Sequence, residues 1–361
     1  MPFDTRQTVS VLTLARGRAA HLANVVRGLI RQDRMPDELV VAVMQEDLYE
    51  DLPHAPFPIR QIRVPYTDAL PLSEARNTVA RAALGDALIF LDVDCIPAPS
   101  LVADYLHHLS EAEGLFMGEV LYLPAGRADR GWDYPDFDAV AVRHSDRQGP
   151  PQGPRRRCED YRCFWSLNFA LSRATWEASG GFDEAYRGYG GEDTDFGRTL
   201  DDRGIAIWWI RGGRVYHQHH PHCMPPIHHI PAILHNTEVF ARKWGHRTME
   251  HWLHAFRLMG LVRATASGLK MVREPGPADF ALCQQQSHMP YAATGRVIRI
   301  LEDRARMADG LGPDTRTPEE RHAAMTAAQE ELLAVAAPVT PAAAALPPQA
   351  LGARVPATVA P

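Results

Sequence analysis

The sequence lacks several features that mark well-known classes of protein. None of its five cysteines stands in a Cys-x-x-Cys pair, so we expect reduced thiols and neither a disulfide framework nor a zinc ribbon. No stretch reaches the about 18 apolar residues of a membrane-spanning helix, and the first residues lack the apolar segment of a signal peptide. Basic residues are not in excess, with 38 Lys and Arg against 44 Asp and Glu and a net charge of -6, which argues against nucleic acid as a partner. We therefore expect a cytoplasmic protein with no transmembrane segment.

What is present is the composition of a globular protein, with 45% apolar and 23% charged residues over 361 positions. In the first half, apolar runs alternate with amphipathic segments. This alternation predicts an α/β fold with a mostly parallel, doubly wound sheet flanked by helices. Strands are expected at 9–14, 38–43, 59–64 and 87–91, and helices at 19–34 and 73–84.

The later part of the chain is less regular. Residues 123–160 are rich in Pro, Gly, Asp and Arg without periodicity, which predicts an irregular loop or lid. Helical patterns at 231–244, 249–262 and 293–307 predict a helical region over residues 231–337, outside the sheet. Residues 338–361 hold 14 Ala or Pro and a single charge, a composition typical of a disordered tail.

Two acids follow the apolar run at residues 87–91. Asp92 and Asp94 are two positions apart, so in an extended chain they point the same way. The run fits a strand covered on both faces, and ligands bind just beyond the carboxyl ends of such strands. Two carboxylates at that place suit a hard cation that carries a phosphate. The alternative is that they open a turn before Ile96-Pro97.

A second acidic group follows a glycine-rich turn, where Glu192, Asp193 and Asp195 come directly after Gly190-Gly191. Acids in the first turn of a helix are favoured by its dipole by about 0.3 to 1 kcal/mol each, so helix capping explains one of them. Three acids exceed what a cap needs, and the glycines allow a ligand close to the backbone. We therefore interpret this group as functional.

Histidines are concentrated late in the chain, with ten of the seventeen between His217 and His254. The run from His217 to His222 follows a strand that we expect at 213–216. Its spacing is too crowded and irregular for a zinc motif, so only one or two of these imidazoles need be metal ligands. The others can be solvated or pack against the Pro225-Pro226 turn.

Six stretches occur along the chain in a set order: the strand at 9–14 with a basic turn, Glu74-Ala-Arg-Asn77 before Gly85-Asp86, Leu91-Asp-Val-Asp-Cys-Ile-Pro97, Gly180-Gly-Phe-Asp183, Gly190-Gly-Glu-Asp193 and Tyr216-His217. In this order they resemble family 2 glycosyltransferases of the GT-A fold, and the later half resembles the carboxy-terminal domain of the β-1,4-galactosyltransferases. The resemblance covers roughly residues 8–260. It implies that residues 1–122 bind a nucleotide-sugar and that residues 161–230 bind the acceptor and carry catalysis.

The resemblance also implies a metal site and a base. Asp94 and His217 would bind a divalent cation, with Asp92 near the ribose or the metal's waters. A nitrogen ligand makes Mn²⁺ a better fit than Mg²⁺. Asp193 would be the general base, and Glu192 would hold an acceptor hydroxyl.

Acceptor and donor contacts follow from the same resemblance. Tyr189 stands where galactosyltransferases have a Trp that stacks on the acceptor, and Trp165 is a further candidate for acceptor binding. Arg76 is a candidate donor contact. Family members usually have Asp-Asp or Asp-Gly after the second strand, and here Glu46 or Asp47 would take that place.

Arg16 and Arg18, after the first strand, are further candidate contacts for the donor's diphosphate or base. A solvated basic turn explains them equally well.

The expected activity is an inverting, metal-dependent transfer of a hexose or N-acetylhexosamine from a nucleotide-sugar, UDP-linked, to a hydroxyl of a glycan or lipid-linked acceptor. A cation stabilises the leaving diphosphate, and a carboxylate takes the proton of the attacking hydroxyl. No clear nucleophile for a retaining double displacement stands out. Two alternatives remain: a catalytically idle GT-A scaffold and a histidine-rich metal-binding module. Nucleotidyl transfer is disfavoured, since no glycine- and lysine-rich phosphate loop occurs near the amino terminus.

Overall fold

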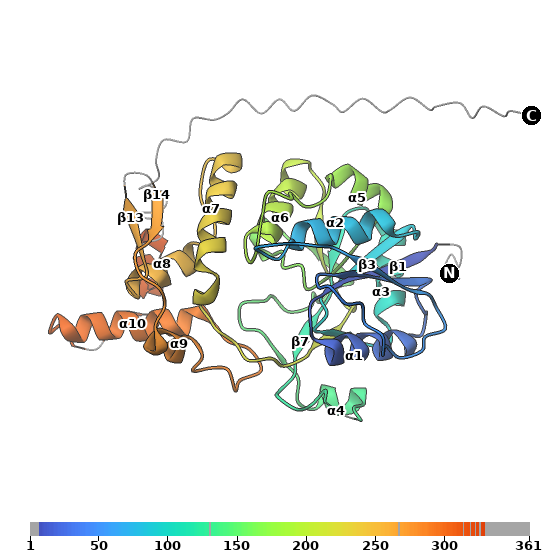
Figure 1. Cartoon of the computed structure of the whole chain (residues 1–361), viewed down its shortest axis with the longest axis horizontal. Helices are drawn as coiled ribbons and strands as arrows, with labels where there is room; N and C mark the ends of the chain where they lie inside the picture. Colours follow the sequence, from blue (N-terminus) through green and yellow to red (C-terminus); the bar gives the residue numbers. More distant parts are fainter. Residues whose placement is uncertain are drawn as a thin grey trace, which may run out of the picture.

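The computed structural model describes residues 7–129, 131–265, 268–312, 314–317, 319–321, 323–324 and 326–328. The expected tail at 338–361 lies outside these residues. An eight-stranded sheet forms the centre of the structure, with the strand order β3-β2-β1-β4-β10-β6-β11-β9 (Figure 1). Its strands are β1 (Val9–Ala15), β2 (Glu38–Val43), β3 (Ile59–Arg63), β4 (Ala87–Leu91), β6 (Leu115–Met117), β9 (Arg155–Arg157), β10 (Asn168–Ser172) and β11 (Ile207–Ile210).

The predicted α/β architecture is confirmed. The strands β1 to β4 are mutually parallel, as the alternating pattern predicts. The sequence pattern did not indicate that β10 runs antiparallel between β4 and β6. This insertion brings the chain around Asn168 to the carboxyl end of β4, where the backbone N–H of Asp92 donates to the carbonyl of Leu167 at 2.9 Å.

Helices cover both faces of the sheet, which explains why its strands are apolar throughout. One face packs on α1 (Ala19–Ile30) and α3 (Leu101–Glu111), where Ile89 and Leu91 of β4 point. The other face packs on a second group of helices, where Leu88 and Phe90 point. These helices are α2 (Leu72–Ala82), α5 (Arg173–Ser179) and α6 (Glu192–Asp202).

A small second sheet joins segments that are far apart in the sequence. Its order is β5-β12-β7-β8, formed by Cys95–Pro97, Val215–His217, Val120–Tyr122 and Val142–Arg143. In this register His217 pairs with Cys95 on one side and with Tyr122 on the other. The expected loop at 123–160 contains β8, β9 and the short helix α4 (Tyr134–Asp138).

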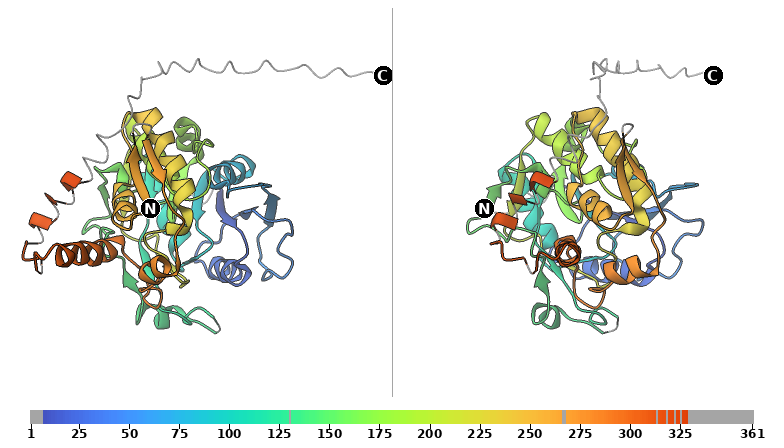
Figure 2. Two further views of the ribbon diagram at one scale, coloured as in Figure 1. Left: turned by 60° about the vertical axis from the view of Figure 1, so that its left-hand side comes forward. Right: turned by 90° about the vertical axis from the view of Figure 1, so that its left-hand side faces the viewer.

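The carboxy-terminal part forms a layer beside the sheet, on the side away from β1 and β3 (Figures 1 and 2). It has its own apolar core, which includes Ile233, Leu253, Phe256 and Cys283. The helical patterns expected here correspond to α7, α8 and α10, whereas the β13-β14 hairpin was not anticipated. Its elements are the 3-10 helix η2 (Ile227–His229), α7 (Ile230–Trp244), α8 (Glu250–Leu258), β13 (Val262–Thr265), β14 (Gly268–Met271), α9 (Pro277–Cys283) and α10 (Thr294–Ala308). Another 3-10 helix, η1 (Tyr161–Cys163), comes before this layer in the sequence.

Among the helices that the structure describes, none combines the length and the apolar character needed to cross a bilayer.

Candidate active site

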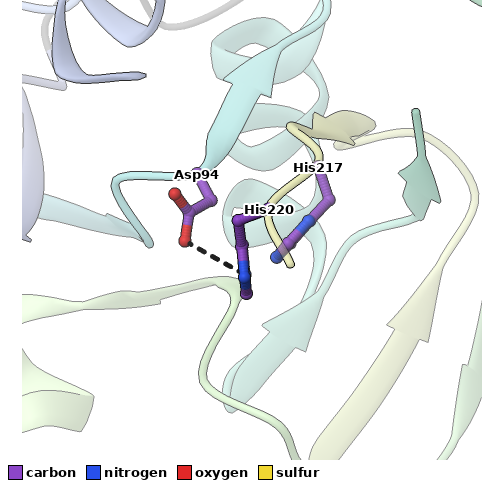
Figure 3. A group of neighbouring side chains, drawn as sticks. All are labelled: Asp94, His217 and His220. Carbon is purple, nitrogen blue, oxygen red and sulfur yellow. Dashed lines mark ion pairs between the residues drawn. The ribbon is translucent and has the colours of Figure 1, made fainter. Parts of the chain in front are cut away.

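The small sheet places Asp94 and His217 side by side. His217 pairs with Cys95, the residue after Asp94, and the backbone N–H of Gln218 donates to the carbonyl of Asp94 at 2.7 Å. His220 completes the arrangement, since one possible ligand atom from each of Asp94, His217 and His220 lies within 4.8 Å of the others (Figure 3). We call these three residues the Asp-His group. The sequence predicted Asp94 and His217 but did not single out His220.

The Asp-His group fits a divalent cation. Asp94 and His217 are both 6% exposed, and Asp94 Oδ1 and His217 Nδ1 lack a hydrogen-bond partner among the described residues. Burial lowers the pKa of His217 to about 3, so its imidazole is neutral, the form that binds metals. Burial alone would raise the pKa of Asp94, but the groups around its carboxylate, including the charged Arg18, outweigh burial and the pKa is lowered. One carboxylate and two imidazoles suit Mn²⁺ or Zn²⁺ better than Mg²⁺.

Nitrogen groups surround the Asp94 carboxylate. Arg18 forms an ion pair with Asp94 Oδ2, and His21 Nε2 lies 3.8 Å from Oδ1. Arg18 keeps 40% of its side chain exposed, so it can also reach a ligand. His21, on the first turn of α1, is a residue that sequence reasoning missed, since no local pattern marks it. The guanidinium of Arg16 lies 5.7 Å from the ring centroid of Tyr66.

Next to this group, three carboxylates gather near one buried arginine. Arg76 is 4% exposed, and its Nη2 lies 3.8 Å from Asp92 Oδ1 while its Nη1 lies 3.4 Å from Glu192 Oε1. Asp193 follows Glu192 at the start of α6. We call Asp92, Glu192 and Asp193 the acid group. The position of Arg76 between two of these acids is that of a side chain that holds them in place.

Burial and mutual repulsion shift the protonation of the acid group. Burial raises the pKa of Asp92 to about 6, with Asp94 and Glu192 adding to the effect and Arg76 opposing it. Burial and the charge of Glu192 raise the pKa of Asp193 to about 7. Asp193 therefore titrates near neutral pH, where a carboxylate works best as a proton acceptor.

The third acid of the glycine-rich motif has a different role. Asp195 accepts hydrogen bonds from the Tyr186 hydroxyl at 3.1 Å and from Trp244 Nε1 at 2.7 Å, and it forms an ion pair with Lys243 at 2.7 Å. These contacts tie α6 to α7. The excess of acids that the sequence shows is therefore partly structural, since Asp195 joins α6 to α7 whereas Glu192 lies beside Arg76.

Tyr189 lies against the carboxy-terminal layer. Its ring stacks with His229 at a centroid distance of 4.9 Å and with Trp252 at 5.6 Å. The following Gly190 has φ +94°, and a Cβ there would lie 2.9 Å from Met249 Sδ and 3.0 Å from Trp252 Cζ3. The need for glycine at this position thus comes from packing as well as from its backbone conformation.

The remaining candidates are Glu46, Asp47 and Trp165. Glu46 and Asp47 are exposed. The contact between the turns after β1 and β2 is made instead by their neighbour Gln45, whose Oε1 accepts from the backbone N–H of Gly17 at 2.6 Å. Trp165 packs against His144 of the 123–160 loop, with a centroid distance of 5.3 Å.

The chain matches two families. Residues 10–174 match glycosyl transferase family 2, and residues 155–221 match a family described as the N-terminal domain of galactosyltransferase. The two segments contain Asp92, Asp94, Glu192, Asp193 and His217, and they overlap in the region of β9 and β10.

Two curated relatives are validoxylamine A glucosyltransferases, from Streptomyces hygroscopicus subsp. limoneus and from subsp. jinggangensis (strain 5008). Each is 24% identical over 276 residues, which covers 65% of this chain. The match covers 56% of the first relative and 60% of the second. The chain therefore spans little more than half the length of the curated relatives that it matches.

Three solved structures share 14% sequence identity with the chain. GalNAc-T7 with UDP, GalNAc and Mn²⁺ aligns over 85% of this chain and 58% of its own, with a TM-score of 0.48. The S. aureus TarS fragment 1-349 with UDP-GlcNAc aligns over 59% of both chains, with a TM-score of 0.44. The catalytic domain of Drosophila β1,4-galactosyltransferase 7 with xylobiose aligns over 57% and 66%, with a TM-score of 0.36.

The two family matches confirm the resemblance that the motifs indicated: residues 10–174 are similar to glycosyl transferase family 2, and the galactosyltransferase-type match continues to residue 221.

Proposed function

We propose that this chain is an inverting glycosyltransferase. It moves a hexose or N-acetylhexosamine from a UDP-linked nucleotide-sugar to a hydroxyl of a glycan or lipid-linked acceptor. The metal that it uses is Mn²⁺. The observation that carries the proposal is the meeting of the Asp-His group and the acid group beyond the end of β4. One group suits a cation, and the other suits proton transfer.

On the donor side, Asp94, His217 and His220 would hold the cation. When bound, this ion supplies Lewis-acid stabilisation of the charge that develops on the leaving diphosphate. Arg18, half-exposed and next to Asp94, adds a guanidinium that pairs well with phosphate oxygens. Arg76 holds Asp92 and Glu192 in place, so that these two side chains are already positioned when the donor binds.

On the acceptor side, Asp193 is the base. Its Oδ1 accepts the backbone N–H of Thr194 at 2.8 Å, which leaves Oδ2 for an acceptor hydroxyl. Glu192 is engaged by Arg76 and positions that hydroxyl. The hydroxyl attacks the anomeric carbon as its proton passes to Asp193 and the diphosphate departs, which inverts the anomeric configuration in one displacement.

The acceptor itself lies toward the carboxy-terminal layer in this proposal. The ring of Tyr189 stacks with those of His229 and Trp252. Tyr189 stands just before Asp193 in the sequence Tyr189-Gly-Gly-Glu-Asp193. Aromatic rings of this kind offer the apolar faces on which sugar rings pack. The name of the curated relatives makes a glucosyl donor the first sugar to test.

The test is a screen for nucleotide release with UDP-, GDP- and dTDP-sugars in the presence of Mn²⁺, followed by NMR of the product's anomeric configuration. We expect release from a UDP-sugar, dependence on Mn²⁺ and inversion at the anomeric carbon. Asp136→Ala, which removes an aspartate that is exposed on α4, is the matched control for Asp94→Ala and should release nucleotide like the wild type. A product with retained configuration would overturn the single-displacement mechanism.

A metal titration with and without UDP separates this proposal from its two alternatives. A glycosyltransferase binds Mn²⁺ more tightly when UDP is present, because the diphosphate supplies ligands. A histidine-rich metal-binding module binds Zn²⁺ tightly whether or not UDP is present. An idle scaffold binds both metal and UDP but releases no nucleotide from any sugar donor.

A further inference from the structure

An arginine side chain holds one oxygen of the Asp94 carboxylate. Arg18 Nη1 pairs with Asp94 Oδ2, and the same Oδ2 lies 3.9 Å from His220 Nε2, the approach that Figure 3 marks with a dashed line. The other oxygen, Oδ1, lies 3.8 Å from His21 Nε2 and lacks a hydrogen-bond partner among the described residues. Arg18 therefore holds the oxygen that faces an imidazole of the Asp-His group.

The ion pair with Arg18 supplies a positive charge that Asp94 needs. Asp94 is 6% exposed, and a buried carboxylate without a cation is costly. His217 and His220 do not supply that cation, since burial lowers the pKa of both imidazoles. The charge of Arg18 adds to this lowering of both pKa values, so the guanidinium lies near both imidazoles. Arg18 therefore gives Asp94 the positive charge that a bound metal ion would also give.

The backbone at Arg18 is fixed, whereas part of its side chain is open to solvent. Gly17 and Arg18 are both left-handed, with φ 58° and 51°, a conformation that is uncommon for a residue with a Cβ. The Gly17 carbonyl accepts from the Tyr49 hydroxyl at 2.5 Å, and its N–H donates to Gln45 Oε1 at 2.6 Å. The Arg18 carbonyl accepts from the N–H of Leu22 at 3.0 Å, at the start of α1. With 40% of the Arg18 side chain exposed, the guanidinium can move by side-chain rotation alone.

We propose that Arg18 takes the place of the metal ion at Asp94 in the metal-free protein and moves to the diphosphate when metal and donor bind together. This inference rests on the proposed function, which puts Mn²⁺ at Asp94 and a UDP-sugar beside it. A divalent cation at Oδ2 repels the guanidinium, and the diphosphate offers oxygens that an arginine binds in a bidentate manner. Each ligand thereby favours the binding of the other. Arg18 makes the site select the metal–nucleotide complex over the free metal.

The test measures the Kd for Mn²⁺ of the full chain with and without UDP, by calorimetry and by the electron paramagnetic resonance signal of free Mn²⁺. Arg18→Gln should bind Mn²⁺ alone more tightly than the wild type, by about tenfold, because the competing cation is gone. With Mn²⁺ present, its affinity for UDP should fall by about tenfold, because the diphosphate loses the guanidinium. An arginine that only stabilises the fold or only binds phosphate would not weaken the binding of Mn²⁺ alone.

Arg16→Gln is the matched control. It removes the same charge from the same turn, but the Arg16 guanidinium lies over the ring of Tyr66, so its Kd for Mn²⁺ alone should equal that of the wild type. Equal gains in affinity from Arg16→Gln and Arg18→Gln would overturn the proposal, since general charge repulsion would then explain both. If Arg18→Gln does not fold, Arg18→Asn replaces it, because Asn adopts the left-handed backbone more readily than most residues.

The same titrations separate a failure of this exchange from a failure of the proposed function. A wild type that binds no Mn²⁺ even with UDP present overturns the proposed function, and the role of Arg18 falls with it. A wild type that binds Mn²⁺ with UDP, beside a folded Arg18 variant whose affinity for Mn²⁺ alone is unchanged or lower, overturns the role of Arg18 only.

Discussion

The Asp-His group and the acid group lie side by side, yet their carboxylates have opposite surroundings. Around Asp94 the neighbours are the nitrogen groups of Arg18, His21 and His220. Around Arg76 the neighbours are the carboxylates of Asp92 and Glu192. One region is a carboxylate among cations and imidazoles, and the other is a cation among carboxylates.

This difference separates the two chemical tasks. The pKa of Asp94 is lowered, whereas burial and Glu192 raise the pKa of Asp193 to about 7. Asp94 is therefore ionised and ready to bind a cation over the whole neutral range. Asp193 exchanges its proton in that range, which is the property of a general base. In the proposed mechanism, two residues of the same type therefore take two different roles because their neighbours differ.

Asp94→Ala should produce the largest effect, because it removes the only carboxylate of the Asp-His group. We expect the loss of both Mn²⁺-dependent nucleotide binding and turnover. Calorimetry with UDP and Mn²⁺ measures the first, and nucleotide release measures the second. A variant that keeps the wild-type Mn²⁺-dependent affinity would show that the metal is held elsewhere.

Asp193→Asn should remove the proton acceptor of the acid group and leave metal binding by the Asp-His group intact. It keeps the shape of the side chain but removes the proton acceptor, so kcat should fall on the order of 10² to 10⁴-fold while donor affinity changes little. Steady-state kinetics of Asp193→Asn, measured next to those of Glu192→Gln, decide which of the two acids is the general base. Rapid transfer by Asp193→Asn, together with an inactive Glu192→Gln, would assign the base to Glu192.

His220→Ala should weaken the Asp-His group without abolishing it, because Asp94 and His217 remain. We expect the Kd for Mn²⁺ to rise on the order of tenfold, which corresponds to about 1.4 kcal/mol. His219→Ala is the matched control, since His219 Nε2 points to the carbonyl of Ser287 at 2.9 Å instead. Equal losses in the two variants would mean that His220 is not a metal ligand.

The smallest expected effect is on the pH dependence of stability. The pKa of Asp193 is about 7 in the folded state against an ordinary value of 3.8, so the folded state binds more protons between these values. The stability from this group is present at low pH and is lost as pH rises through 7. Asp94, whose pKa is lowered, contributes stability that is lost as pH falls.

Urea unfolding of the metal-free protein between about pH 5 and pH 8 measures this difference. Asp193→Asn should reduce the decline of the unfolding free energy toward high pH, by on the order of 1 kcal/mol. A decline as steep as that of the wild type would show that Asp193 does not titrate in this range.

Predictions from the sequence were best where the signal is local. The strand at 87–91 is apolar because both of its faces are buried. The position of Asp92 and Asp94 just beyond this strand could therefore be predicted from the sequence. The three acids of the glycine-rich turn were harder to interpret, since Asp195 is bound by Lys243 and Trp244. These partners lie about fifty positions away in α7, where no local pattern could indicate them.

The sequence by itself determined the α/β class, the resemblance to family 2 glycosyltransferases and the residues that stand at strand and helix ends, because periodicity and short motifs are properties of neighbouring positions. Only the tertiary structure decided which distant groups meet. The pairing of β5 with β12 brings His217 and His220 to Asp94, and the fold buries Arg147 between Trp165 and Trp209. It also decided protonation, because the pKa of a carboxylate depends on the charges and the burial that the folded chain places around it.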